Sequence, residues 1–245
     1  MREPSPKSDS RGDMRSPQRS DEVKERFYDT IADCFDEVVN RYDLGRRIEI
    51  VFDEMLVGES LAGRRFLDVG CGTGWFAQRA VSEGARVTAL DIGAKLLAKT
   101  REKCDASLVA ADACRLPFPD DAFDIVVSSE CIEHTQEPLR AVAEMCRILK
   151  SGGTLVITVP NKFWRPSATF AAVFKLRPYE GLENWLWWWE LRRSLTKEDV
   201  RIAAMSGFHL FPPVVAASWP FLRYADRFGM TVGPLMLNLA VKAIK

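Results

Sequence analysis

The sequence has few of the residues on which several common classes of functional site depend. Only 2 of its 245 residues are histidine, and its 6 cysteines are scattered with no CxxC or CxxxC pair. Neither a zinc site nor a redox dithiol is indicated, because both need closely spaced ligand pairs. We therefore expect reduced thiols and, as the default compartment, the cytoplasm.

Net charge and long apolar runs are also missing. The chain carries 34 Lys+Arg and 34 Asp+Glu, so its formal charge is zero. Non-specific binding to nucleic acid needs a basic face that displaces counterions, so no nucleic-acid partner is expected. The first 26 residues lack the apolar core of a secretory signal. The apolar stretch Phe228–Val241 is interrupted by glycine and proline and is shorter than the roughly 20 residues that span a bilayer.

The chain divides into a polar tail and one domain. Residues 1–20 are mostly Ser, Pro, Arg and Asp, and they are predicted to be disordered because they offer little to bury. Residues 21–245 are predicted to form a single domain. Apolar residues recur at helical spacing from Asp21 and again from Leu44 to Leu56, so two helices are expected before Gly58.

Strand and helix patterns then alternate along the chain. Strands are predicted at Phe66–Val69, Arg86–Leu90, Ser107–Ala110, Phe123–Val127 and Thr154–Val159, and helices near Trp75, at Ala94–Lys103 and at Pro138–Leu149. This alternation is typical of βαβ units and of a parallel sheet with helices on both faces. The predicted fold class is therefore α/β, with a doubly wound sheet.

The pattern changes after Pro160, where six of the seven tryptophans lie. Thr196 is predicted to cap a helix that ends at Gly207, followed by strands at Phe208–Phe211 and Leu237–Ile244. Helical spacing would place three tryptophans on one side with Leu182, and Trp187 elsewhere; the three are Trp185, Trp188 and Trp189. They are interpreted as core, as a lid over an apolar pocket, or as a contact with a membrane surface.

A glycine-rich turn connects the first predicted strand to the helix after it. Gly70, Gly72 and Gly74 allow the backbone to approach a ligand closely, and the helix beyond offers unpaired N–H groups. Asp91 ends the next strand, where a carboxylate can accept both hydroxyls of a ribose. In an open parallel sheet, ligands bind at the carboxyl ends of the strands. The sequence therefore predicts a nucleoside site at this edge.

The spacing of the glycines and the acidic residue before them indicate which nucleoside cofactor the site would bind. The sequence has G-x-G-x-G in place of the dinucleotide pattern G-x-G-x-x-G, and Asp68 stands two residues before its first glycine. A carboxylate there disfavours a pyrophosphate and favours a cation. S-adenosylmethionine carries a sulfonium and an ammonium group, so it is preferred over NAD. A nicotinamide oxidoreductase is kept as the weaker alternative.

Several motifs in the same order resemble the class I S-adenosylmethionine-dependent methyltransferase family over residues 44–160. These motifs are Phe66–Gln78, Asp91, Ala111–Ala113, Leu116–Asp120, Phe123–Val126 and Leu149–Gly153. The resemblance implies a Rossmann-like sheet of seven strands whose last strand is antiparallel. It also implies a cofactor-binding core at 64–160, and we expect helices over the cofactor at 21–58. After Asn161 the sequence departs from the related enzymes, and we expect an acceptor-side insertion at 161–195 followed by a C-terminal helix and strands at 196–245.

The resemblance also implies roles for individual residues. Gly70, Gly72 and Gly74 would lie under the methionine part of the cofactor, Asp91 at the ribose, Ile92 beside the adenine, and Asp112 with Ala113 at its amino edge. Arg46 (or Arg47) resembles an arginine that meets the cofactor carboxylate, and Asp68 and Ser129 are also assigned to the cofactor site.

A narrower similarity concerns the acceptor side. Glu130, Glu133 and His134, together with Val159–Asn161, are similar to the polyprenyl hydroxybenzoquinol O-methyltransferases and their relatives. His134 is predicted to be the general base, assisted by Glu133 or Glu130. In some relatives these three residues are proposed magnesium ligands, but histidine is a poor ligand for magnesium, so no metal is assigned. The alternative without a functional role is that the acidic residues complement a helix dipole. The other histidine, His209, is interpreted as structural.

The predicted function is methyl transfer from S-adenosylmethionine to a small acceptor, as an O-methylation of an apolar, phenolic or lipid-linked compound. The alternative is a catalytically silent module with the same fold. The expected partner is a small or lipid-like acceptor, with peripheral membrane contact through the Trp-rich segment and no obligate protein partner.

Overall fold

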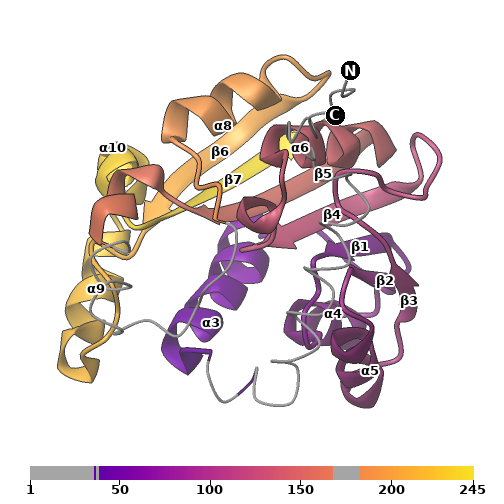
Figure 1. Ribbon diagram of the computed structural model, residues 1–245, viewed down its shortest axis with the longest axis horizontal. Helices are drawn as coiled ribbons and strands as arrows, with labels where there is room; N and C mark the ends of the chain where they lie inside the picture. Colours follow the sequence, from indigo (N-terminus) through magenta and orange to yellow (C-terminus); the bar gives the residue numbers. More distant parts are fainter. Residues whose placement is uncertain (1–35, 37–38, 168–182) are drawn as a thin grey trace, which may run out of the picture.

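The computed structural model describes residue 36 and residues 39–167 and 183–245 (Figure 1). The predicted disordered tail at 1–20, nearly all of the helix expected from Asp21, and Leu182 lie outside the described residues. Within the described ranges, no helix is both long enough and apolar enough to cross a membrane.

The described part of the chain forms one seven-stranded sheet in the order β3-β2-β1-β4-β5-β7-β6. The strands are β1 (Arg65–Val69), β2 (Arg86–Asp91), β3 (Ser107–Ala110), β4 (Phe123–Ser129), β5 (Leu149–Pro160), β6 (Arg201–Phe208) and β7 (Asn238–Ile244). Neighbouring strands pair in parallel from β3 to β5, whereas β7 runs antiparallel to both β5 and β6. The predicted α/β class, the Rossmann-like sheet and its antiparallel last strand are confirmed.

Helices cover both faces of the sheet (Figure 1). They are α3 (Arg41–Ile48), which continues as the π-helix η1 (Glu49–Met55), α4 (Trp75–Ser82), α5 (Ala94–Lys103), α6 (Pro138–Ile148), α8 (Trp188–Leu195), α9 (Trp219–Asp226) and α10 (Gly229–Val232). Short 3-10 turns are η2 (Ile132–His134), η3 (Lys162–Trp164), η4 (Ala216–Ser218) and η5 (Gly233–Leu235).

Alternate residues of the central strands supply two separate cores. Phe66 and Ile125 pack with η1 and α4, whereas Leu67 and Val126 pack with α6 and α8 on the other face. All four side chains are fully buried. A strand that is buried on both faces has an apolar residue at nearly every position, which explains why these strands were recognisable as apolar runs.

The predicted helix from Thr196 to Gly207 is wrong. Thr196 lies just after the end of α8, and Arg201–Phe208 is the edge strand β6. Exposure alternates along the first half of β6, as a half-buried strand requires, and β6 pairs with β7 over nearly its whole length. Tertiary pairing therefore overrides the local signal of a capped helix. The predicted strand Phe208–Phe211 is also wrong, because β6 ends at Phe208 and His209 has a φ of 57°.

The prediction that Trp185 shares a helix with Trp188 and Trp189 is wrong as well. Trp185 lies in extended chain, where Leu186 forms a bridge with Asn161, and α8 begins three residues later. Trp185 is therefore buried apart from the helix, while the ring of Trp187 stacks on that of Trp189 with 4.7 Å between centroids. Helical spacing placed Trp185 on α8 because nothing local indicates that the chain is extended there.

Candidate active site

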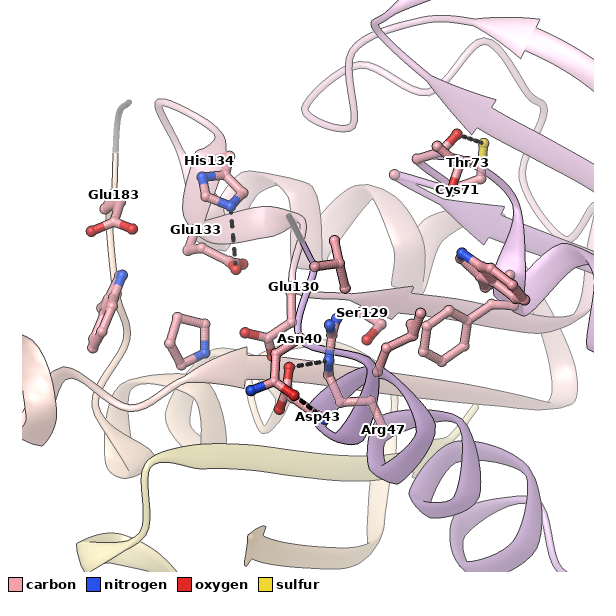
Figure 2. A pocket seen from close by; sticks show the side chains of 18 residues that line it. Asn40, Asp43, Arg47, Cys71, Thr73, Ser129, Glu130, Glu133, His134 and Glu183 are labelled. Carbon is pink, nitrogen blue, oxygen red and sulfur yellow. Dashed lines mark hydrogen bonds and ion pairs between the residues drawn. The ribbon is translucent and has the colours of Figure 1, made fainter. Parts of the chain in front are cut away.

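A cavity of about 320 Å³ lies at the carboxyl ends of β1 and β4 (Figure 2). The chain leaves β1 to form β2 on one side, and β4 joins β1 on the other, so this is the topological switch point of the sheet. Ligands of doubly wound folds bind at this point. The walls come from the turn after β1, the loop after β4, α3, Pro160 and the segment containing Trp185.

The turn after β1 needs its glycines. Gly70, Gly72 and Gly74 have φ values of 74°, 53° and 88°, a region that residues with a side chain rarely adopt. A Cβ on Gly70 would lie 2.2 Å from Sγ of Cys131. One on Gly74 would lie 2.7 Å from Cγ2 of Thr100. The turn therefore packs tightly against the loop after β4 and against α5, while Gly70 and Gly72 line the cavity.

Asp91 joins the turn to the end of β2. Its Oδ2 accepts a hydrogen bond from the backbone N–H of Gly72 and its Oδ1 accepts one from Gly93, both at 2.9 Å. Asp91 itself is not among the residues that line the cavity.

Asp68 does not face the cavity, contrary to the argument that its charge meets a cationic ligand. Its Oδ2 accepts a hydrogen bond of 3.0 Å from the backbone N–H of Ala77 in the first turn of α4. Burial, with a smaller contribution from the charge of Asp91, raises the pKa of Asp68 to about 7. This carboxylate supports the start of a helix, where unpaired N–H groups attract it.

The structure distinguishes between the two adjacent arginines of α3. Arg46 points away from the cavity, and its guanidinium contacts Asp226 at 2.8 Å and Glu54 at 2.6 Å. Arg47 lines the cavity and donates from Nε to Oδ2 of Asp43 at 3.0 Å. The assignment of Arg46 is therefore corrected to Arg47, because successive residues of a helix point about 100° apart.

Asp43 and Arg47 form an ion pair on the cavity wall (Figure 2). Asp43 also lies 3.1 Å from Nε2 of His209. Burial alone would raise the pKa of Asp43, but Arg47 and His209 outweigh it and hold the pKa below its ordinary value. Burial alone would lower the pKa of Arg47, yet Asp43, Glu130 and Glu133 raise it. Both partners therefore stay charged at neutral pH.

Glu130 directly follows β4 and has an unusual backbone φ of 50°. Its carboxylate accepts hydrogen bonds from Nδ2 of Asn238 at 3.1 Å and from Oγ1 of Thr158 at 3.3 Å. Burial, with the nearby charge of Glu133, raises the pKa of Glu130 to about 8, although Arg47 opposes the shift. Glu130 therefore holds a proton at neutral pH. Oγ of Ser129 lies 2.8 Å from Oγ1 of Thr158, and Ser129 also lines the cavity.

Glu133 and His134 are consecutive residues of the turn η2, and both line the cavity (Figure 2). Oε1 of Glu133 lies 3.6 Å from Nε2 of His134. Glu133 is almost fully buried, whereas the side chain of His134 is 23% exposed and can meet a ligand. No group of three or more His, Cys, Asp and Glu side chains in the described ranges is arranged to hold a metal ion.

The residues expected near the adenine lie outside this cavity. Ile92 follows β2, while Asp112 and Ala113 follow β3, so they share the carboxyl edge of the neighbouring strands. Oδ1 of Asp112 accepts a hydrogen bond of 2.9 Å from the backbone N–H of Cys114. Ala113 is buried in the core. Their roles toward the adenine stay predictions.

Sequence reasoning missed Asp43 and Asn40, which line the cavity together with Trp185. Asp43 stands four residues before Arg47 on one helix, and this spacing indicates an ion pair. The pattern gives no sign that the pair faces a ligand site. Trp185 was noticed, but it was placed on a helix.

Comparisons with known proteins agree with this geometry. Residues 67–157 match a family described as a methyltransferase domain. The chain is 36% identical over 168 residues to a demethylmenaquinone methyltransferase of Renibacterium salmoninarum, a match that covers 64% of this chain and 70% of that one. It is 38% identical over 131 residues to a phosphatidylethanolamine N-methyltransferase of Cereibacter sphaeroides, which covers 50% and 63% of the two chains.

A solved structure supports the fold. The magnesium protoporphyrin IX methyltransferase of Synechocystis PCC 6803, solved with bound S-adenosylhomocysteine, superimposes with a TM-score of 0.67 at 15% identity. The match covers 91% of this chain and 99% of that one. The match to a methyltransferase domain and the methyltransferase relatives favour S-adenosylmethionine over the nicotinamide alternative. The chain belongs to the class I S-adenosylmethionine-dependent methyltransferases, and S-adenosylmethionine is its cofactor.

Proposed function

We propose that this methyltransferase transfers the methyl group to an oxygen of an apolar, phenolic or lipid-linked acceptor, with His134 as the general base. One observation carries the proposal: the partly exposed imidazole of His134 lies on the cavity wall with Glu133 beside it. An imidazole in this position can take a hydroxyl proton, and a buried carboxylate next to it stabilises the imidazolium that forms.

The residues at the switch point fit the cofactor. The turn at Gly70 and Gly72 lines the cavity, and the carboxylate of Asp91, which accepts a hydrogen bond from the N–H of Gly72 at the end of β2, would hold the ribose. Arg47 would meet the cofactor carboxylate. Ile92, Asp112 and Ala113 would continue the site along the carboxyl edge of the neighbouring strands. When bound, S-adenosylmethionine supplies a methyl group that is already electrophilic because its sulfur is positively charged.

The protein's part in the reaction is therefore mainly to orient the acceptor and to remove its proton. Orientation of this kind is worth roughly 7–11 kcal/mol at best. Glu130, which is protonated at neutral pH and lines the cavity, would donate a hydrogen bond to the acceptor. Glu133 would hold His134 in place. These roles put a donor and a base on the same wall.

The acceptor side of the cavity favours an apolar or aromatic compound. Apolar side chains contribute to its lining, among them Leu44, Phe76, Pro160 and Trp185. The two relatives are named for methylation of a quinone precursor and of a phospholipid, which are both lipophilic. These names support a lipid-like acceptor for this chain.

The test is a methylation assay with purified protein, S-adenosylmethionine and a panel of phenols, quinols and phosphatidylethanolamine, with the product identified by mass spectrometry. We expect an O-methyl product from a phenol or quinol. We also expect the His134→Gln variant to lose activity while it binds S-adenosylhomocysteine in a calorimetric titration. A product methylated only on carbon or nitrogen would contradict the proposed acceptor atom.

A further inference from the structure

Large apolar side chains are concentrated on one exposed part of the molecule. Within the described ranges, seven of the eleven exposed large hydrophobic residues come from the segment 214–235. They are Val214, Val215, Phe221, Tyr224, Phe228, Met230 and Leu235, and we call them the α9–α10 surface. Val214 is 82% exposed and Met230 is 74% exposed. Exposed apolar side chains that gather on one part of a protein often mark a site that contacts a partner or a membrane, whereas single exposed ones do not.

The α9 helix is apolar on both sides. Leu222 and Ala225 are buried against the domain, as the inner face of a surface helix should be. Phe221 and Tyr224 are three residues apart and exposed, so they share the outer face of α9, where solvent-exposed helices normally carry charged residues. Phe228, in the turn between α9 and α10, is exposed as well. The ring centroids of Tyr224 and Phe228 lie 5.7 Å apart.

The exposed charges of this segment have one sign. Between residues 212 and 235 the charged residues are Arg223, Asp226 and Arg227. Asp226 is buried and paired with Arg46, whereas both arginines are exposed. Arg223 contacts Glu49 on η1, and the guanidinium carbon of Arg227 lies 5.8 Å from the ring centroid of Tyr224. Aromatic side chains with arginines among them are the composition of a surface that enters the headgroup region of an anionic bilayer.

The α9–α10 surface adjoins the active-site cavity. Asn40, which lines the cavity, donates from Nδ2 to the carbonyl of Pro213 at 3.1 Å. Tyr42 stacks on Trp219 with 4.5 Å between ring centroids and donates to its carbonyl. Figure 1 shows α9 beside α3, on the side away from α4 and α5. A bilayer that contacts this surface would therefore lie next to one wall of the cavity.

We propose that the α9–α10 surface docks this enzyme on anionic lipid membranes. The sequence had suggested such a contact for the Trp-rich segment, and the structure points to a different part of the chain. The proposal rests only on the exposure of these side chains, on their charged neighbours and on their position beside the cavity. A membrane at this surface would give a lipid-linked acceptor a short path to the cavity. Vesicle binding needs no turnover, so it is tested separately from the proposed reaction.

The test is co-sedimentation of the full chain with vesicles. One set is phosphatidylcholine alone, and the other contains about 30 mol% phosphatidylglycerol. We expect binding to the anionic vesicles and at least about fivefold weaker binding to the neutral ones, because each arginine near the surface contributes about that factor. The Phe221→Gln/Met230→Gln variant should bind anionic vesicles at least about tenfold more weakly, because it removes inserted apolar area. Arg227→Gln should reduce only the preference for anionic lipid.

Matched variants make the result specific. Val57→Gln/Leu139→Gln changes two exposed apolar residues elsewhere on the molecule and should bind as the wild type does. Thermal unfolding of each variant shows that the fold is kept. Absence of vesicle binding, or equal loss in both double variants, would overturn the proposal. It would also be overturned if Trp189→Gln abolished binding while Phe221→Gln/Met230→Gln did not. A concentration-dependent dimer that the latter substitution dissociates, without vesicle binding, would instead identify the surface as a contact between two copies.

Discussion

The carboxylate of Asp43 lies 3.0 Å from Nε of Arg47, and both side chains face the cavity between α3 and the glycine turn. The ion pair is largely buried, with side chains 22% and 12% exposed. It sets the charge of the wall that would receive the cofactor carboxylate.

Replacement of Arg47 by glutamine should affect both cofactor binding and stability. The variant removes the arginine from a largely buried ion pair and leaves Asp43 with His209 alone; loss of one partner of a buried pair costs at most about 3–5 kcal/mol. We expect that loss in the free energy of unfolding by urea, and at least about tenfold weaker binding of S-adenosylhomocysteine. Arg79→Gln is the matched control, because Arg79 pairs with Asp53 and Glu83 at the surface and should cost no more than about 1 kcal/mol. Equal costs for the two variants would show that the Asp43 pair has no special role.

Replacement of His134 by glutamine should lower the turnover number by about 10²–10⁴ and leave the affinity for S-adenosylhomocysteine nearly unchanged. Steady-state kinetics and calorimetry separate the two effects. The other histidine is the natural control, since His209 is fully buried and contacts Asp43 rather than the cavity. His209→Gln should lower stability more than His134→Gln does. Unchanged turnover in His134→Gln would remove this residue from the mechanism.

The raised pKa of Glu130 predicts how stability depends on pH. Its pKa is about 8 in the folded protein and near 4.5 in the unfolded chain. Between these values the folded state holds a proton that the unfolded state has lost, so the free energy of unfolding falls as pH rises. Glu130→Gln mimics the protonated form and should flatten the fall of the melting temperature over this window.

Asp68→Asn should flatten the same curve over a lower window, because the pKa of Asp68 is raised from 3.8 to about 7. The control is Glu137→Gln, since the side chain of Glu137 is 62% exposed. A wild-type melting temperature that does not fall between about pH 5 and 8 would contradict both assignments.

Asp36 ties the chain before α3 to the glycine turn. Its carboxylate accepts from Oγ1 of Thr73 and Nζ of Lys103, both at 2.5 Å, and from Nε1 of Trp75 at 3.0 Å. We expect Asp36→Ala to speed the dissociation of S-adenosylhomocysteine by about three- to tenfold, because three hydrogen bonds beside the cavity are lost. Stopped-flow dissociation measures this rate. A double-mutant cycle tests whether Lys103 acts through Asp36. If Lys103→Met changes the dissociation rate as much in the Asp36→Ala variant as in the wild type, the two residues are not coupled.

Gly70→Ala should destabilise the protein severely. The new Cβ would lie at a φ of 74° and 2.2 Å from Sγ of Cys131. The strained backbone costs about 1 kcal/mol, and overpacking adds about 1–3 kcal/mol. Gly58→Ala isolates the backbone part, because Gly58 has a φ of 82° and nothing within 4 Å of the added Cβ. Cys131→Gly should restore part of the stability of Gly70→Ala, and a lack of rescue would show that the contact is not the cause.

Local patterns were sufficient for several elements of the domain. Ala94–Lys103 is a helix with the predicted bounds, and Pro138 starts α6 because proline suits the first turn of a helix. The glycine turn was recognisable because its positive φ values leave few residues other than glycine. β6 was not predicted as a strand. It lies at the edge of the sheet, where its exposed positions weaken the apolar pattern, and it depends on β7 for its hydrogen bonds.

The sequence by itself determined the fold class and the cofactor turn, because both follow from apolar periodicity and from glycine conformations along a short stretch of chain. Only the tertiary structure decided which side chains face the cavity. Arg47 faces it and Arg46 does not, because the packing of α3 fixes the rotation of the helix about its axis. The pairing of Asp43 with His209, which is 166 residues away, and the exposure of the α9–α10 surface likewise depend on contacts between distant segments. No local pattern encodes such contacts.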